Sequence, residues 1–395
     1  MKLYIIAYSV TCCSYTIDTI NRKCHDMIQF AVYQKFSELV VLFLALFVIN
    51  GCGKTTPSKT NPSVYGIKIY EYDGDFSELF EEWKSIGINT VFASVELNTD
   101  ETFRSLALKY SITRFVILPT FYDPDVLKEH PEWYAITSKG EKAEDSWVRF
   151  VCPSCEEFRR YKVDYIARIT RELNPDGLSI DFMRHFVYWE QVYPDRTPES
   201  IMNTCFDSRC IESFQDDTGI SIPENLNTPD TRAAWIFENH LAEWSEWKCG
   251  LIASMLEDIV SEAKKIKPDI KINIHTVPWR RKDFNGAIKI VAGQDFSKLS
   301  QLADYLSPMT YSHMVRQPPE WIHSVVEDIA DQAVCQVVPS IQVGNDAFTL
   351  DQFTIALDAS LMPPSQGVVF WSWDALARSP EKKETVKKYI VNSVQ

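Results

Sequence analysis

Residues 176–185 read DGLSIDFMRH, a short apolar run that ends in charged side chains. Read as a strand, the run points Leu178 and Ile180 to one side, because strand side chains alternate between the two faces. Ser179 and Asp181 then point to the other side. A buried strand that delivers charge at its carboxyl end is typical of a β/α barrel, where functional residues gather at the carboxyl ends of the strands.

From residue 64 onward the sequence alternates expected strands with expected helices. The other strands are expected at 64–72, 90–96, 114–122, 271–277, 305–314, 336–343 and 367–373. The helices are expected at 76–86, 100–110, 156–173, 231–265 (with a break near Gly250), 296–302, 319–332, 350–360 and 380–391. This pattern predicts the α/β class and a single (β/α)8 TIM barrel over residues 64–395. A barrel of about 250 residues leaves room for two insertions, 123–153 after strand three and 186–228 after strand four.

An open, doubly wound parallel sheet is the alternative arrangement for this alternation. No GxGxxG motif follows the first expected strand, so a dinucleotide crevice is not indicated.

The composition indicates a globular protein that does not bind nucleic acid. The chain has 395 residues and is 45% hydrophobic, which is enough for a large core. Its 40 basic against 54 acidic residues give a net charge of −14, whereas binding to a phosphate backbone needs clustered Lys and Arg. The 11 Trp, 17 Tyr and 22 Phe suit stacking on sugar rings, although most of them are expected in the core.

The N-terminal region resembles an export signal. Residues 39–49 form an apolar run too short to span a bilayer comfortably, and Asn50-Gly51-Cys52 follows it like the lipobox of bacterial lipoproteins. We expect residues 1–26 to precede the true start, residues 27–51 to be the signal peptide, and residues 52–63 to be a polar tether. Cys52 is then the lipidation site, and the protein is exported and lipid-anchored to the membrane of a bacterial cell envelope. An uncleaved N-terminal anchor is the alternative.

If the protein is exported, six further cysteines would lie in an oxidising compartment. They are Cys152, Cys155, Cys205, Cys210, Cys249 and Cys335. We expect disulfides or free thiols there. The first four could instead form a four-thiolate zinc site, and the CxxC pair at 152–155 could act in redox catalysis, although no thioredoxin-like βαβ unit surrounds it.

Polar and aromatic side chains follow the expected strand ends, which converge in a barrel. The candidate substrate-binding residues are Tyr70, Arg184, His185, His275, Tyr311, Gln342, Trp371, Trp373 and Asp374. Acidic and aromatic types dominate this set, which suits a neutral polyol such as a sugar. His275 is expected to hydrogen-bond substrate or orient a carboxylate, or to be structural. The histidines show no HxH or HExxH spacing, so we expect no metal and no cofactor at this face.

Hydrolysis of a glycoside needs two carboxyl groups, one ionised and one protonated. Asp181 is the candidate for the ionised nucleophile or base, and Arg184 nearby would favour its charged form. For the acid, Glu96 has the strand phase of an inward residue, and Glu190 follows Trp189 in the second insertion. Asp123 and Asp374 are further candidates for the acid.

Three groups of residues carry a resemblance to a known class of enzymes. They are Cys152-Pro-Ser, then Phe158-Arg159-x-Tyr161, then Asp176-Gly177-x-Ser179-Ile180-Asp181-Phe182-x-Arg184. The pattern resembles barrel-type glycoside hydrolases related to the alpha-amylase and alpha-galactosidase superfamilies. The resemblance implies a catalytic role for Asp181. The chain departs from the alpha-amylase family at Ser179, where that family has arginine, and at His275, where it has a glutamate acid.

The sequence therefore favours a glycoside hydrolase that acts on an extracellular or periplasmic glycan through a carboxylate pair including Asp181. One alternative is a non-catalytic, glycan-binding surface lipoprotein on the same scaffold. In that case binding survives Asp181→Asn and falls on loss of Trp371 or Trp373. A metal-dependent hydrolase or deacetylase is the third hypothesis.

Overall fold

The computed structural model describes residues 64–344 and 347–392. The predicted signal peptide, the lipidation site Cys52 and the polar tether lie outside these residues. Within them, no helix is both long enough and apolar enough to cross a membrane.

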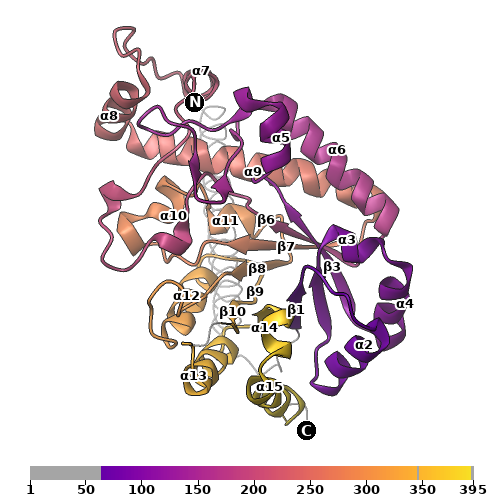
Figure 1. Ribbon diagram of the computed structural model, residues 1–395. Coiled ribbons are helices and arrows are strands. Elements are labelled where there is room, and N and C mark those ends of the chain that lie inside the picture. The colour runs from indigo at the N-terminus through magenta and orange to yellow at the C-terminus, as the bar shows by residue number, and fades with distance from the viewer. Residues whose placement is uncertain (1–63, 345–346, 393–395) are drawn as a thin grey trace, which may run out of the picture. The chain divides into compact units, whose positions relative to one another are not determined.

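The described residues form an α/β fold around one curled sheet of nine parallel strands (Figure 1). The strands are β1 (Val64–Ile69), β2 (Thr90–Ala93), β3 (Thr113–Pro119), β6 (Gly177–Asp181), β7 (Lys271–Thr276), β8 (Tyr305–Pro308), β9 (Gln336–Val337), β10 (Ser340–Gln342) and β11 (Gly367–Trp371). Their order in the sheet is β10-β11-β1-β2-β3-β6-β7-β8-β9.

The two ends of this order, β9 and β10, are neighbours in the sequence. Only Val338 and Pro339 separate them, and proline interrupts the ladder because it has no N–H to donate. The Val338 N–H donates to the carbonyl of Leu306 in β8, and the Pro339 carbonyl accepts from the N–H of Val369 in β11, both at 2.9 Å. One short segment thus hydrogen-bonds to both edges, and the sheet is TIM-barrel-like.

Helices alternate with the strands and cover the outside of the sheet (Figure 1). The α-helices are α2 (Phe76–Ser85), α3 (Val95–Thr99), α4 (Glu101–Tyr110), α5 (Pro124–Glu129), α6 (Glu156–Leu173), α7 (Ser208–Thr218), α8 (Pro229–Asn239), α9 (Leu241–Ile266), α10 (Ala287–Ile290), α11 (Phe296–Leu299), α12 (Trp321–Ala330), α13 (Leu350–Leu361), α14 (Trp373–Ala377) and α15 (Pro380–Asn392). The helix predicted at 156–173 is confirmed at the same bounds as α6. Asp100, the first residue of the helix expected at 100–110, is the N-cap of α4, since its carboxylate accepts from the N–H of Phe103 at 2.9 Å.

Several sequence predictions about element bounds are wrong. The strand expected over 305–314 ends at Pro308, and the strand expected over 336–343 is divided into β9 and β10. The helix expected over 231–265 is two helices, and the break lies at His240, whose backbone is not helical, rather than at Gly250, which lies inside α9. The strand expected over 90–96 ends at Ala93. Ser94 caps α3 there, because its hydroxyl accepts from the Leu97 N–H at 3.3 Å. Glu96 is therefore helical.

Two long segments leave the carboxyl ends of β3 and β6. Residues 120–155 contain α5, the 3-10 helix η1 (Pro131–Trp133) and the hairpin of β4 (Glu144–Asp145) with β5 (Val148–Arg149). Residues 182–228 contain η2 (Trp189–Gln191), η3 (Pro198–Ser200) and α7. The segments pair through backbone hydrogen bonds from Phe206 to Ile136 (2.9 Å) and from Ser138 to Asn203 (3.0 Å). They form one structure beside the strand ends.

Alternate strand positions fill the inside of the curled sheet in layers. The lower layer is an apolar cluster of Val64, Phe92, Phe115, Ile117, Val338 and Val369. Nearer the carboxyl ends lies a buried polar network. In it, Asn273 donates to Ser179 Oγ (3.1 Å), Ser307 donates to Asn273 (2.7 Å), and Ser179 is hydrogen-bonded to His275 Nε2 (2.9 Å). This network forms the floor beneath the strand ends.

Candidate active site

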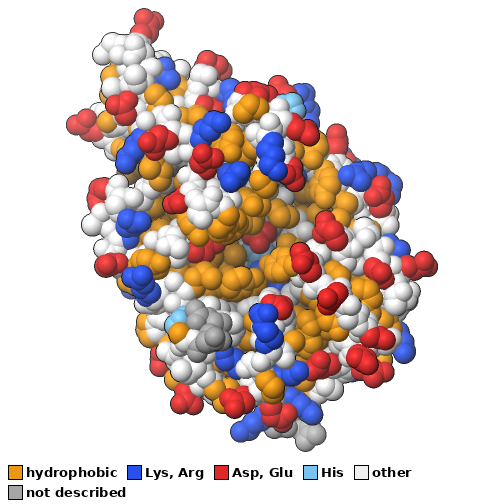
Figure 2. All heavy atoms as spheres, in the orientation of Figure 1, with side chains coloured by type: hydrophobic (Ala, Val, Ile, Leu, Met, Phe, Trp, Pro, Cys, Tyr) orange, Lys and Arg blue, Asp and Glu red, His pale blue; other side chains and the backbone are white. Residues whose placement is uncertain are grey.

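A cavity of about 600 Å³ opens at the carboxyl ends of the strands. Figure 2 shows a hollow near the centre of the molecule, with hydrophobic side chains around it and acidic side chains inside it. The residues that line the cavity are Lys68, Tyr70, Ile117, Pro119, Tyr122, Trp147, Asp181, Phe182, Arg184, Tyr188, Trp189, Glu190, Gln191, Met309, Tyr311, Met314 and Trp371. Six of the residues named from the sequence are among them: Asp181, Glu190, Tyr70, Arg184, Tyr311 and Trp371.

Asp181 is the last residue of β6 and shares its inward face with Ser179. The side chain is 8% exposed and lines the cavity. One carboxylate oxygen accepts the N–H of Phe182 at 2.7 Å, and Phe182 adopts a left-handed backbone with φ of 52°. Such a backbone is unusual for an aromatic residue and is found most often at functional sites. It turns the chain out of the strand directly after the carboxylate.

Glu190 reaches the same cavity from η2 in the second long segment. Its Oε2 atom is buried and has no hydrogen-bond partner among the described residues. Burial raises the pKa of Glu190 to about 7, and the negative charge of Asp181 adds to this rise, while Arg184 opposes it. Near neutral pH the carboxyl group is therefore protonated in a large fraction of the molecules. A carboxyl group in this state can donate a proton.

Arg184 supports the loop that carries Glu190. The guanidinium is 1% exposed, and its Nη1 donates to the carbonyl oxygens of Val187 (2.7 Å) and His185 (3.3 Å). It also lies over the ring of Phe150, 4.7 Å from the centroid. Burial lowers the pKa of Arg184 to about 10, opposed by Glu190 first and Asp181 second. Arg184 and Asp181, both inside the described ranges, form no direct ion pair, but their charges attract each other.

Lys68 is the cation of the site that sequence reasoning missed. It lies in β1, is 1% exposed and donates from Nζ to the Tyr311 hydroxyl at 3.3 Å. Burial lowers the pKa of Lys68 to about 8, and attraction to Asp181 opposes that effect. The signal was present, because Lys68 precedes Tyr70 by two residues and so shares its inward face in an otherwise apolar strand.

Two groups of aromatic side chains wall the cavity. In the first, Tyr311 stacks on Trp371 with ring centroids 4.6 Å apart, and Trp189 lies 5.8 Å from Tyr311. The second group comprises Tyr122, Trp147, Phe182 and Tyr188. Here the Trp147 indole N–H donates to the Tyr188 hydroxyl at 3.2 Å and so joins the two long segments. Flat apolar faces around a few polar groups suit the binding of a sugar ring.

Three predicted residues lie outside the cavity on the helical layer. Glu96 is exposed on α3. The prediction that it points into the barrel assumed that it lies in a strand, so this prediction is wrong. Trp373 packs in α14 against Trp83, with centroids 5.8 Å apart. Asp374 is exposed and pairs with Arg378 at 2.6 Å. Asp123, the further acid candidate, caps α5 and pairs with Lys162 at 2.7 Å.

The remaining three predicted residues are buried next to the site rather than in its lining. His275 lies in the floor network, and burial with the nearby Lys68 lowers its pKa well below the usual range, so the imidazole is neutral. His185 packs on Gly293, and burial with the charge of Lys248 likewise lowers its pKa. Gln342 accepts from the Met314 N–H at 3.1 Å and donates to the Gly344 carbonyl at 2.9 Å.

The cavity therefore combines one carboxyl group whose pKa is raised to about 7 with a second carboxylate at a strand end. Two acidic groups in unlike environments can divide the roles of acid and base between them. Lys68 adds a buried positive charge close to Asp181, and two groups of aromatic side chains line the same cavity. A protonated carboxyl group can donate a proton to a leaving oxygen, and an ionised carboxylate can act as nucleophile or base.

Neither a family model nor a curated protein sequence matches this chain. Solved structures with a similar fold include the glycoside hydrolase domain of PgaB (BpsB) from Bordetella bronchiseptica. It has a TM-score of 0.60 and 11% identity over 83% of this chain and 98% of that chain. The beta-galactosidase from the psychrophilic Marinomonas ef1 has a TM-score of 0.62 and 10% identity; the match covers 83% of this chain and 59% of that chain. The endo-1,4-beta-mannanase from Rhizomucor miehei has a TM-score of 0.51 and 12% identity, with 84% and 95% coverage. This chain therefore has a curled parallel-strand fold that these glycoside hydrolases share.

Proposed function

We propose that this protein is a glycoside hydrolase whose carboxylate pair is Asp181 and Glu190. The observation that carries the proposal is the placement of both groups in one cavity, with burial raising the pKa of Glu190 to about 7. A glycosidase needs one carboxyl group that is protonated at its working pH and one that is ionised. The fold shared with known glycoside hydrolases supports the same proposal.

In the proposed reaction Glu190 donates its proton to the glycosidic oxygen as the bond to the anomeric carbon breaks. Asp181 acts on that carbon either directly, as nucleophile, or through a water from which it takes a proton. The leaving alcohol carries away the proton of Glu190, which ends the step as a carboxylate. Positive charge that develops on the sugar is stabilised by the negative Asp181, and Lys68 keeps the buried site from accumulating net negative charge.

The proposed substrate is a saccharide that lies between the two aromatic walls. The stacked rings of Trp371 and Tyr311 belong to one of these walls, and Trp147 with Tyr122 belongs to the other group of aromatic side chains that line the cavity. Trp147 is 45% exposed, which leaves its ring accessible at the rim. Because the similar folds named above include a beta-galactosidase and an endo-1,4-beta-mannanase, β-linked galactosides and mannans are the first probes to use.

The direct test is a matched pair of glutamate variants in the purified full chain. Glu190→Gln should lower turnover of an aryl β-galactoside or of β-1,4-mannan by about 10²- to 10⁴-fold, the usual contribution of a general acid. Glu96→Gln changes the same chemical group at an exposed position and should retain wild-type turnover. Equal activity of the two variants would reject Glu190 as the acid. Saturable saccharide binding without turnover on any probe would instead favour the glycan-binding alternative.

We further propose that β9 and β10 count as two halves of one strand, which gives the eight strands of a (β/α)8 barrel. The hydrogen bonds of Val338 and Pro339 to β8 and β11 support this count. The long segments 120–155 and 182–228 are then insertions after strands three and four. Replacing Pro339 with alanine should restore an N–H to this edge without loss of fold, measured by circular dichroism.

We also propose that the protein is exported and lipid-anchored at Cys52, which the lipobox-like Asn50-Gly51-Cys52 supports. Expression in a bacterial host with labelled palmitate tests this location. The wild type should carry label and fractionate with membranes, and Cys52→Ser should do neither. Label on Cys52→Ser, or an unlabelled soluble wild type, would contradict the proposal.

A further inference from the structure

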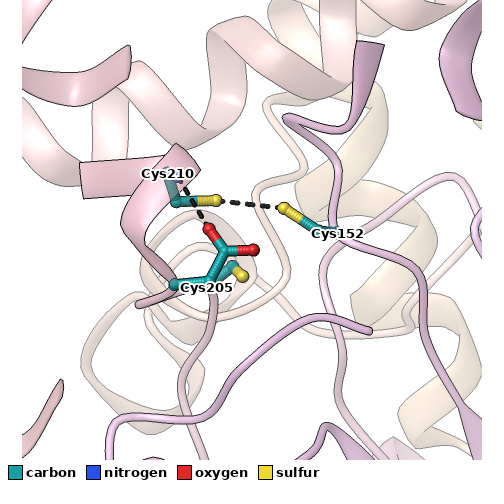
Figure 3. Close-up of side chains that lie close together, drawn as sticks. Cys152, Cys205 and Cys210 are labelled. Atoms are coloured by element: carbon teal, nitrogen blue, oxygen red, sulfur yellow. Dashed lines mark hydrogen bonds between the residues drawn. The ribbon is translucent and has the colours of Figure 1, made fainter. Parts of the chain in front are cut away.

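A second cluster of reactive side chains lies where the two long segments meet. Cys152 lies near the end of the first segment, and Cys205, Asp207 and Cys210 belong to the second. One possible ligand atom from each of these four residues lies within 4.8 Å of the other three. Figure 3 shows the three labelled cysteines turned toward one another, with the Cys152 and Cys210 sulfurs 3.3 Å apart. All three cysteines are fully buried.

Cys155, the fourth cysteine of the alternative four-thiolate site, is not part of this cluster. Cys155 precedes α6, and its sulfur contacts Glu157 and Arg209, each at 3.7 Å. Asp207 lies where a fourth ligand is needed instead. One of its carboxylate oxygens caps α7 by accepting the Cys210 N–H at 2.7 Å. The remaining lone pairs of the carboxylate are available for a cation.

The sulfur spacing fits a shared metal ion better than a disulfide. A disulfide needs sulfurs about 2.05 Å apart, and a tetrahedral zinc site with Zn–S bonds of about 2.3 Å separates its sulfurs by about 3.8 Å. The observed 3.3 Å between Cys152 and Cys210 is nearer to the second value. A disulfide involves only two sulfur atoms, whereas three sulfurs and a carboxylate lie close together here.

The surroundings of the cluster can balance the charge of several ligand anions. Arg209 donates to the second carboxylate oxygen of Asp207 at 3.0 Å. The backbone N–H of Ile136 donates to the Cys205 sulfur at 3.2 Å, the kind of contact that stabilises a thiolate.

We propose that Cys152, Cys205 and Cys210, as thiolates, and Asp207, as a carboxylate, bind one zinc ion that joins the two long segments. Binding releases the three thiol protons to solvent and involves no redox change. The site is closed by protein ligands, as structural zinc sites are. The joined segments carry Trp147 and Glu190 at the cavity wall, so the ion fixes the position of the wall without contacting substrate.

The test is zinc content by inductively coupled plasma mass spectrometry on the desalted full chain. We expect about one zinc per chain in the wild type, as for a closed four-ligand site, and less than about a tenth of that in Cys210→Ser. Asp207→Asn keeps the helix cap, since asparagine also caps, but loses the anionic ligand and should bind zinc about 10- to 100-fold more weakly. Cys155→Ser is the matched control and should retain full zinc content.

Cobalt substitution supplies a readout that does not depend on expression yield. The wild type and Cys155→Ser should show the near-ultraviolet charge-transfer band of thiolate-bound Co²⁺, and Cys210→Ser should lose intensity. A metal-free wild type with a disulfide from Cys152 in peptide mapping would overturn the proposal. Loss of zinc in Cys155→Ser with retention in Asp207→Asn would overturn the ligand set in favour of four thiolates. None of these readouts depends on glycosidase activity.

Discussion

Replacing Glu190 with glutamine should change how the stability of the protein depends on pH. The pKa of this group rises from 4.5 to about 7 on folding. At a pH between 4.5 and about 7, Glu190 is protonated in the folded protein and ionised in the unfolded chain. The proton that Glu190 holds therefore stabilises the folded state. This contribution to the free energy of unfolding is fully present below about pH 4.5 and is lost as the pH rises through about 7. At 1.36 kcal/mol per pH unit, the whole effect is about 3 kcal/mol.

Between pH 5 and pH 8, with allowance for the partial exposure of the side chain, we expect about 2 kcal/mol of this effect. Urea unfolding of the full chain, followed by tryptophan fluorescence, measures it. On going from pH 5 to pH 8 the wild type should lose about 2 kcal/mol more stability than Glu190→Gln. Glu96→Gln controls for removing one carboxylate at an exposed site. If the wild type and Glu190→Gln change in parallel, Glu190 is already ionised at pH 5 and cannot be the acid.

Four further measurements test the proposed active site and the proposed zinc ion. Activity on any substrate should fall as the pH rises through about 7, where Glu190 loses its proton, and a pH–rate profile that still climbs at pH 8 would contradict this. Lys68→Met removes the cation near Asp181 and should lower kcat by about 10²-fold, measured by steady-state kinetics, without changing the circular dichroism spectrum. Trp371→Ala should raise KM for a saccharide about tenfold, equivalent to ~1.4 kcal/mol of lost stacking, whereas Tyr188→Phe, which keeps the ring, should not. Chelation of the proposed zinc should lower the melting temperature by several degrees in differential scanning calorimetry, and an unchanged melting temperature would argue against a structural ion.

The general fold could be predicted because hydrophobic periodicity is strong in this chain. The helical spacing of α6 follows from burial of one face, whereas all five residues of β6 are buried, and both elements agree with the structure. The strand period also predicts that Asp181 points to the same side as Ser179, and its side chain lines the cavity. The polar residues at strand ends do not indicate Lys68, which lies inside an otherwise apolar strand.

The sequence offers candidates for the acid partner of Asp181 but does not decide between them. The alternation of a strand favours Glu96, but the strand ends at Ala93. The Ser94 side chain caps α3 there, and Glu96 lies on that helix. Glu190 lies on one turn of 3-10 helix within a segment that has no periodicity, and its place in the cavity depends on tertiary packing, such as that of Trp189 against Tyr311. The same limit applies to Asp207, which cysteine spacing alone could not pair with Cys152.

The central claim is that Asp181 supplies the ionised carboxylate for cleavage of a glycosidic bond. The most direct measurement is turnover of an aryl β-galactoside by Asp181→Ala in the full chain, with and without sodium azide. We predict a loss of about 10³-fold without azide and partial recovery with it, because a small anion can occupy the space of the missing carboxylate and attack the anomeric carbon. Wild-type turnover by Asp181→Ala in the absence of azide would contradict the assignment.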